Sequence, residues 1–535
     1  MPDQAMLSAI LATARSGRHA EAVAAARSAL SAGFEHPLLL NLGALGLEQE
    51  GKPAEAESLL RRAVQLAPQD AGCRNALGLC LLKLGRPREA LAEFDAVVQL
   101  DAALPYAHVN RGNALQASGD VDGAQACYER ALALDPRQAM ALAGLANINC
   151  GRGAYSEARL WADKALAVMP GLTDAVVILA AIEQGQGELR RAEARVRELL
   201  GNGDLTIPQR AHAQGLLGDI LDSAGGYEEA FAAYSGCNEM LRRLHADRYE
   251  SALEYARDLR GWLEKSPIEA GRASTAHAGG DHGPSAHIFI IGFPRSGTTL
   301  LDVVLAGNPA VVSLSERELL VDAVHAFMRR PEDFAGLARA SPATLARLRQ
   351  AYWARVAAEG VDTAGKSFVD ACALNSLKLP IIARLFPRAK ILYAVRDPRD
   401  VVLSCFTHRF GISAPTFELL TIGGAASYYD AVNRIVTEAT SRLALEICLV
   451  RHEDLVTAFA REMVRICQFL ALEWHPAMGD FALRSRQRGE ALPSMDELLR
   501  GIGTEGLGRW RNYRPHLEPV RELLEPWARR FYYGD

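Results

Sequence analysis

The sequence predicts a helical solenoid in the N-terminal half of the chain, followed by an α/β domain with a mostly parallel sheet. Three observations lead to this prediction: a regular repeat in the first half, a change of pattern at His287, and a turn that resembles a phosphate-binding loop. The chain has 535 residues, of which 49% are hydrophobic, and this is enough for more than one core. We expect the solenoid at residues 3–244, a helix and linker at 245–286, and the α/β domain at 287–535.

The N-terminal half repeats small and aromatic residues at a constant step of about 34 residues. Phe94 and Tyr128 share one large aromatic position, and the alanines of one column are Ala56, Ala90, Ala124, Ala158 and Ala192. Small side chains let antiparallel helices approach closely. The pattern resembles the tetratricopeptide repeat, of which about seven helix pairs fit in this half. Such a solenoid has a concave face that suits a peptide or protein partner. The alternative is a supporting role, including formation of a homodimer.

Charge and composition restrict the function. A net charge of −5 argues against nonspecific binding of nucleic acid. The nine cysteines contain no C-x-x-C pair, which favours reduced thiols over a metal centre. The first residues lack the features of a signal peptide, and no uncharged apolar run reaches the roughly 18 residues that a membrane span needs. We therefore expect a cytoplasmic protein with no membrane span, no metal and no nucleic-acid partner.

A stretch rich in glycine, serine, alanine and proline, Lys265–Ala286, is interpreted as a linker or loop. After it, the short apolar runs HIFIIGF, KILYAVRD and EICLVRHED end in turn or charged residues. Helical patterns such as LKLPIIARLF and AREMVRICQFLAL alternate with these runs. Strands that alternate with helices predict a mostly parallel sheet.

The first apolar run continues into the loop IFIIGFPRSGTT, residues 288–299. Gly292 and Gly297 have the spacing of a nucleotide-binding P-loop, but Thr298 stands where that loop has lysine. Backbone amides at a helix N-terminus attract anions, and an arginine adds a permanent positive charge. The residues expected to bind an anion here are Pro294, Arg295, Ser296, Gly297, Thr298 and Thr299. The alternative is an ordinary turn between a strand and a helix.

The segment AVRDPRDVVLS indicates a second anion site. Arg396 ends a predicted strand, and Ser404 follows eight residues later within a predicted helix. Their charge and hydroxyl group can hold a separate phosphate. The alternative is a surface ion pair between Arg396 and Asp397, which would contribute little.

Together, the repeats, the P-R-S-G-T-T loop and the Arg396–Ser404 spacing resemble bacterial sulfotransferases that join tetratricopeptide repeats to a domain related to the protein-tyrosine sulfotransferases. The resemblance implies that the loop holds the 5′-phosphosulfate of 3′-phosphoadenosine 5′-phosphosulfate, and that Arg396 and Ser404 hold its 3′-phosphate. It also implies sulfuryl transfer to a hydroxyl, such as a tyrosine of a peptide or protein held by the repeats. The resemblance also implies why Thr298 stands in place of the P-loop lysine, since a sulfotransferase cleaves no magnesium-bound triphosphate. A P-loop kinase or nucleotidase is the alternative, and the absent lysine argues against it.

Sulfuryl transfer needs a base for the acceptor and a cation for the leaving group. Glu316, in VVSLSERELL, resembles the family's catalytic glutamate, and Glu318 is the alternative. Arg295 is the expected cation.

The chain departs from the family at a segment of the type D-K-x-P. Asp370 and Asn375 fit, but Ala371 occupies the lysine position, and Lys366 and Lys378 are the nearby substitutes. Loss of such a cation costs about 10²- to 10³-fold in rate. The alternative function is therefore a weak or inactive nucleotide-binding scaffold whose repeats recruit a protein.

Later residues match the family less sharply. His452 stands where relatives often have tyrosine near the adenosine, with a half-buried structural histidine as the alternative. Arg509 and Trp510 lie in a glycine-rich segment that resembles the loop over the nucleotide, and would supply a phosphate contact and a stacking face. His408 is a candidate for contact with the acceptor, although a surface position on a helix is the simpler interpretation.

Overall fold

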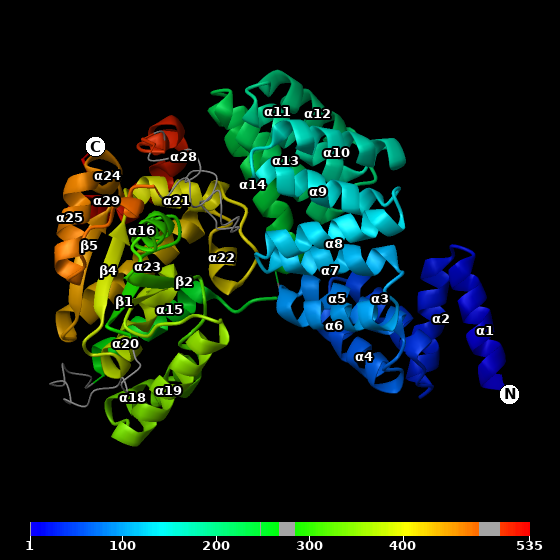
Figure 1. The fold of residues 1–535 in the computed structure, drawn as a ribbon, viewed down its shortest axis with the longest axis horizontal. Coiled ribbons are helices and arrows are strands. Elements are labelled where there is room, and N and C mark those ends of the chain that lie inside the picture. The colour runs from blue at the N-terminus through cyan, green and yellow to red at the C-terminus, as the bar shows by residue number, and fades with distance from the viewer. Residues whose placement is uncertain (1, 247, 267–283, 481–502, 505, 535) are drawn as a thin grey trace. The chain divides into compact units, whose positions relative to one another are not determined.

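A computed structural model describes residues 2–246, 248–266, 284–480, 503–504 and 506–534 (Figure 1). Contacts divide the chain into two compact units, Met1–Gln209 and a second unit that begins at Arg210. The predicted fold class is confirmed, since a helical repeat region precedes a domain with a five-stranded parallel sheet. Most of the predicted linker, residues 267–283, lies outside the described residues. The domain boundaries drawn from the sequence stay predictions.

The first unit consists of antiparallel helix pairs. The second helices of five successive pairs begin at Pro53, Pro87, Val121, Tyr155 and Leu189, which keep a constant spacing of about 34 residues. Proline suits the first position of a helix because its missing amide would lack a partner there in any case. The helices are α1 (Pro2–Arg15), α2 (His19–Ser31), α3 (Pro37–Gln49), α4 (Pro53–Leu66), α5 (Ala71–Lys83), α6 (Pro87–Leu100), α7 (Pro105–Ala117), α8 (Val121–Leu134), α9 (Ala139–Gly151), α10 (Tyr155–Val168), α11 (Thr173–Gly185) and α12 (Leu189–Gly201).

The repeated small and aromatic residues pack on each other. A Cβ atom added to Gly112 would lie 2.7 Å from the Tyr128 ring, and one added to Gly144 would lie 2.6 Å from the same ring. Phe94 fills the space beside Gly78 in the preceding repeat, where an added Cβ would lie 2.5 Å away. The glycines are therefore needed because the aromatic rings occupy the positions where other side chains would begin.

The second unit contains a further helix pair of the same kind. It is formed by α13 (Ile207–Ser223), most of which belongs to this unit, and α14 (Tyr227–His245). A Cβ atom on Gly218 would lie 2.6 Å from Tyr234, which repeats the packing of the first unit. The helix α15 (Ala252–Lys265) follows.

The sheet consists of five parallel strands in the order β2-β3-β1-β4-β5 (Figure 1). The strands are β1 (Ala286–Ile291), β2 (Val311–Ser315), β3 (Ser367–Ala371), β4 (Lys390–Val395) and β5 (Glu446–Arg451). Because all strands run in one direction, their carboxyl ends lie at the same edge. The chain leaves β1 toward β2 and leaves β4 toward β5, so the crossovers diverge between the neighbouring strands β1 and β4. Ligands of parallel sheets bind at such a switch point.

The remaining elements surround this sheet, and α16 and α25 pack on β1, β3 and β5 in one apolar core. The described helices are α16 (Thr298–Leu305), α17 (Val321–Phe327), α18 (Pro331–Ala338), α19 (Pro342–Ala358), η1 (Ala373–Lys378), α20 (Leu379–Leu385), α21 (Pro398–Thr407), α22 (Ala414–Glu418), α23 (Ile422–Arg442), α24 (His452–Thr457), α25 (Phe459–Leu470), η2 (Pro476–Met478), η3 (Arg509–Tyr513), α28 (Arg514–Leu517), η4 (Glu518–Val520) and α29 (Arg521–Arg530). Within the ranges given above, no helix has the length and apolar character needed to cross a membrane.

Candidate functional site

The loop after β1 is fixed at both ends. A Cβ atom on Gly292 would lie 2.7 Å from the Ala394 carbonyl oxygen, so a larger residue does not fit. The Gly292 amide donates to the Ala373 carbonyl at 3.1 Å, and the Ser376 hydroxyl donates to the Gly292 carbonyl at 2.6 Å. At the far end, Gly297 has a φ of 96° and precedes the first turn of α16. The predicted strand, loop and helix are therefore all present.

Arg295 joins this loop to α21. Its φ of 68° is unusual for a residue with a side chain, and strain of this kind is frequent at ligand sites. The Arg295 Nε donates to the Ser404 hydroxyl oxygen at 3.0 Å, and the Cys405 thiol donates to the Pro294 carbonyl at 3.3 Å. The structure thus brings together the two motifs that are predicted to bind anions. The remaining predicted loop residues lie at the start of α16: Ser296, Gly297, Thr298 and Thr299.

Arg396 follows β4 and is buried. One of its Nη atoms donates to the Gly506 carbonyl, while its Nε has no hydrogen-bond partner among the described residues. Asp397 pairs with Arg399 at 2.8 Å, so the alternative of a surface pair between Arg396 and Asp397 is wrong. A buried guanidinium with an unused donor is costly unless a ligand completes it, which fits an anion at this position.

His452 follows β5 and lies against the loop. A Cβ atom on Gly297 would lie 2.6 Å from its Nδ1, which has no hydrogen-bond partner in the described chain. Burial, together with the charges of Arg396 and Arg295, lowers the pKa of His452 to about 3. The imidazole is therefore neutral and faces the two arginines. Its predicted place near the adenosine of a nucleotide stays a prediction.

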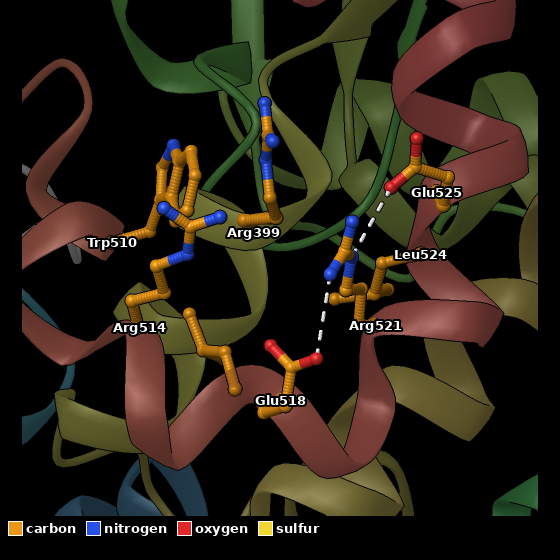
Figure 2. Close-up of a pocket in the computed structure, with 8 residues that line it drawn as sticks. Arg399, Trp510, Arg514, Glu518, Arg521, Leu524 and Glu525 are labelled. Carbon is orange, nitrogen blue, oxygen red and sulfur yellow. Dashed lines mark hydrogen bonds and ion pairs between the residues drawn. The ribbon is translucent and has the colours of Figure 1, made fainter. Parts of the chain in front are cut away.

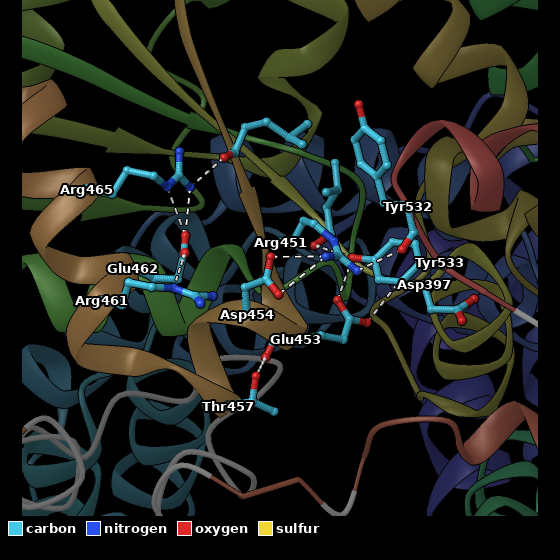
Figure 3. A network of polar contacts seen from close by, with 12 residues as sticks. Asp397, Arg451, Glu453, Asp454, Thr457, Arg461, Glu462, Arg465, Tyr532 and Tyr533 are labelled. Carbon is cyan, nitrogen blue, oxygen red and sulfur yellow. Dashed lines mark hydrogen bonds and ion pairs between the residues drawn. The ribbon is translucent and has the colours of Figure 1, made fainter.

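A polar network secures the chain beside the ends of β4 and β5 (Figure 3). The Glu453 carboxylate accepts from the Asp397 amide at 3.0 Å and from the Tyr533 hydroxyl at 2.5 Å. The Arg451 guanidinium lies 4.5 Å from the centre of the Tyr533 ring and pairs with Asp454 at 3.1 Å. These contacts hold the residues next to Arg396 and His452 in fixed positions.

Glu316 follows β2 with a φ of 50°, a second left-handed residue at the same edge. Its amide donates to the Ala371 carbonyl at 2.8 Å, and its carboxylate accepts from the Ala373 backbone. Water reaches the side chain, although protein surrounds much of it. This partial desolvation and the nearby Asp302 carboxylate raise the pKa of Glu316 to about 7. A carboxylate with such a pKa is suited to general base catalysis near neutral pH.

Glu318 is engaged elsewhere. Its carboxylate pairs with the Lys378 ammonium at 2.6 Å. Although burial opposes it, the nearby Cys372, Glu318 and Asp370 keep the pKa of Lys378 above its ordinary value. Lys378 also acts electrostatically on Glu316. A cation therefore lies close to the end of β3, where Ala371 has none.

The end of β3 is organised by a buried carboxylate. Asp370 accepts from the Tyr352 hydroxyl at 2.9 Å and from the Asn375 amide at 3.0 Å, and the second bond fixes η1. Burial raises the pKa of Asp370 to about 7. Lys366 precedes β3 and therefore lies at the opposite edge of the sheet from Lys378.

Arg509 and Trp510 follow Gly506, whose carbonyl accepts from Arg396, but protein groups hold both of their side chains. Arg509 pairs with Asp222 at 3.0 Å. The Trp510 ring has Arg399 at 3.9 Å and Arg511 at 4.9 Å from its centre, and Figure 2 shows Arg399 beside it. The predicted stacking of a nucleotide on Trp510 would require one of these guanidinium groups to move.

The hollow drawn in Figure 2 lies beside Trp510 and is lined by residues of η4, α28 and α29. Its cavity volume of about 30 Å³ is small.

His408 follows α21 and lies 4.5 Å from the Phe410 ring, measured between centres. Burial and the charges of Arg295 and Arg409 lower its pKa to about 3. His408 is thus a neutral side chain within electrostatic range of Arg295, and its predicted contact with an acceptor stays a prediction.

Sequence reasoning missed two groups. Asp400 accepts from the Gly508 amide at 2.6 Å and from the Trp510 amide at 2.8 Å, and thereby ties residues 506–510, called the late loop below, to α21. Its acidic side chain four residues after Arg396 was the available signal. The second group is the Gly506 carbonyl, which accepts from Arg396: its glycine-rich segment was expected to approach the nucleotide with its backbone, but the contact with Arg396 was not predicted.

The parallel sheet, the glycine loop and two arginines at the switch point define an α/β domain with a candidate anion site. Comparison with known families agrees: a model of the sulfotransferase family matches residues 287–476, and models of the tetratricopeptide repeat match residues 47–109, 109–171 and 179–236. The chain therefore carries tetratricopeptide repeats and a sulfotransferase domain.

Individual relatives are distant. An uncharacterized protein of Aquifex aeolicus is 24% identical over 61% of this chain, which spans 43% of that protein's length. Protein-tyrosine sulfotransferase 2 of Gallus gallus is 26% identical over 46% of this chain and 71% of its own length. Protein-tyrosine sulfotransferase 1 of Danio rerio is 28% identical over 46% of this chain and 72% of its own length. Among solved structures, a tetratricopeptide repeat protein from Parabacteroides merdae is 18% identical, covers 44% of this chain and 92% of its own, and has a TM-score of 0.37.

Proposed function

We propose that this protein transfers a sulfuryl group from 3′-phosphoadenosine 5′-phosphosulfate to an acceptor hydroxyl. The observation that carries the proposal is the pairing of Arg295 with Ser404 beside Arg396, at the divergence of β1 and β4. Buried nitrogen atoms of Arg396 and His452 lack hydrogen-bond partners among the described residues there. A donor with two separated anionic groups matches two cations that lie on different strand ends.

The residues divide the chemistry between them. Backbone amides of the loop and Arg295 bind the 5′-phosphosulfate and stabilise the charge that grows on the leaving phosphate oxygen. Arg396 binds the 3′-phosphate and so positions the donor. Glu316 takes the proton from the acceptor hydroxyl as its oxygen bonds to sulfur, while the bond between sulfur and the phosphate oxygen breaks. The products are the sulfated acceptor and 3′-phosphoadenosine 5′-phosphate.

Lys378 completes the proposal where Ala371 departs from the family. Its ammonium is buried, lies beside Glu318 and acts on Glu316. Released from Glu318, it would neutralise charge on the transferred group from the neighbouring η1 instead of from β3. The proposed enzyme is thus active despite Ala371.

The proposed acceptor is a tyrosine in a peptide or protein, as the names of the relatives in Gallus gallus and Danio rerio suggest. The repeats are proposed to hold that partner. The direct test is incubation with a ³⁵S-labelled donor and a library of peptides that contain tyrosine, with matched peptides in which phenylalanine replaces tyrosine as controls. Label in the tyrosine peptides but not in their phenylalanine controls supports tyrosine as the acceptor. Peptides with serine and glycans are tested in parallel, and label in these alone would show that the acceptor is another hydroxyl.

An inactive scaffold is the second candidate, and Ala371 is the observation that favours it. Calorimetry with 3′-phosphoadenosine 5′-phosphate separates the two. Binding without any transfer, in the wild type and in Ala371→Lys, would establish the scaffold. Strong transfer only in Ala371→Lys would show that Lys378 does not substitute.

A further inference from the structure

The helix pair α13–α14 contacts the helix that carries Ser404. Arg409, which follows α21, pairs with Asp219 of α13 at 2.6 Å. The Asn238 amide of α14 donates to the Phe406 carbonyl at 2.9 Å, and this bond is buried. These groups lie within the second unit, so the end of α21 is anchored to a repeat-like helix pair.

The same helix pair also contacts η3 and α28, which follow Gly508. Asp222 pairs with Arg509 at 3.0 Å and accepts a hydrogen bond from the Tyr513 hydroxyl. Phe231 stacks on His516, with the ring centres 3.7 Å apart and the planes 8° from parallel. One carboxylate thus accepts from two side chains of η3.

The late loop in turn reaches the anion site. The Gly506 carbonyl accepts from Arg396, and the Gly508 and Trp510 amides donate to Asp400 of α21. The Gly508 φ of 70° is a conformation that favours glycine. A continuous set of bonds therefore runs from Asp222 through η3 and the loop to Arg396.

We propose that α13–α14 act as a clamp that positions Gly506–Trp510 against Arg396, and that Asp222 is a positioning residue for the donor nucleotide. The proposal rests on the proposed function, since it concerns the same nucleotide. Arg509 then acts through Asp222 and orients the loop, in place of the direct phosphate contact expected from the sequence. Through this clamp a repeat-like helix pair forms part of the nucleotide site.

The test uses the full-length protein with Asp222→Asn, which keeps the shape and removes the charge. Without nucleotide, we expect amide hydrogen exchange in the peptide covering Gly506–Tyr513 to become about tenfold faster, with the sheet strands unchanged. The Kd for 3′-phosphoadenosine 5′-phosphate should rise about tenfold. The KM for the donor should rise with it while kcat stays close to that of the wild type.

The matched control is Glu239→Gln, which removes an acid from the exposed side of α14, where its partners are Arg242 and Arg243. It should leave exchange and affinity unchanged. Tyr513→Phe should shift both in the direction of Asp222→Asn, which guards against misfolding of one variant.

Unchanged exchange in Asp222→Asn, or faster exchange throughout the second unit with a matching fall in kcat, would overturn the clamp. A wild type that binds no nucleotide would remove the proposed function. In that case the exchange measurement would still decide whether Asp222 holds the loop.

Discussion

The pKa of Glu316 makes the catalytic assignment testable through pH. With a pKa of about 7, the deprotonated fraction rises from about one-tenth at pH 6 to about nine-tenths at pH 8. The deprotonated form is the base, so activity should be lost as pH falls through about 7. A glutamate with its ordinary pKa would change by only about 3% over the same range. The expected result is therefore a rise of about tenfold in kcat/KM between these two pH values.

The assay measures initial transfer of ³⁵S at subsaturating donor across this pH range. Glu316→Gln should lose about 10²- to 10⁴-fold in rate and flatten the profile. Glu318→Gln is the matched control: it lies two residues away, removes the same charge, and should keep the rise with pH. A flat wild-type profile, or one that disappears in Glu318→Gln but not in Glu316→Gln, would refute the assignment.

Three further outcomes are expected. Arg396→Ala should weaken binding of 3′-phosphoadenosine 5′-phosphate by about 10- to 100-fold and leave binding of adenosine 5′-phosphate almost unaffected, because the lost contact is a charge-assisted bond to the 3′-phosphate. Calorimetry with both nucleotides measures the two affinities, and an equal loss for both would contradict this role. Lys378→Met should lower kcat by about 10²-fold with little change in nucleotide affinity. An unaltered kcat in stopped assays would show that Lys378 does not stabilise the transferred group. Gly292→Ala should lower the free energy of unfolding by about 1–3 kcal/mol in urea titrations, because its Cβ would lie 2.7 Å from the Ala394 carbonyl oxygen, and a neutral result would mean that the loop relaxes.

The fold was predictable because its signals are local. Glycines and aromatic rings recur at a constant step along the sequence since each repeat packs in the same way, as Gly112 on Tyr128 shows. The apolar runs of β1 and β4 are continuous because these inner parallel strands are covered on both faces. The strand β3, SFVDA, escaped prediction because it is short and contains the acidic Asp370, whose hydrogen bonds with Tyr352 and Asn375 form only in the folded chain.

The site was predictable in part. Motifs that follow strands directly, such as those of Arg295, Arg396 and Glu316, meet at one edge because the sheet is parallel. The late segment is different: its residues are polar and aromatic, and the sequence does not tell whether they face a ligand or the protein. Arg509 was expected at a phosphate but pairs with Asp222, which lies far earlier in the chain. Contacts between distant segments of this kind depend on tertiary packing and leave no spacing to recognise.

The alanine at 371 illustrates why spacing alone is a weak guide to charge. Ala371 is the last residue of β3, and the backbone then turns into η1, which Asp370 fixes through Asn375. That short helix carries Lys378 back toward the sheet edge, where it meets Glu318 after β2. A cation therefore lies near the end of β3 although residue 371 carries no charge. Its partner Glu318 is largely exposed, so water can solvate that carboxylate when the ion pair opens, whereas the buried ammonium then needs a second anion as its partner. In the proposed reaction the charge must lie at a given place in space, and the proposed role of Lys378 supplies that charge from η1 instead of β3.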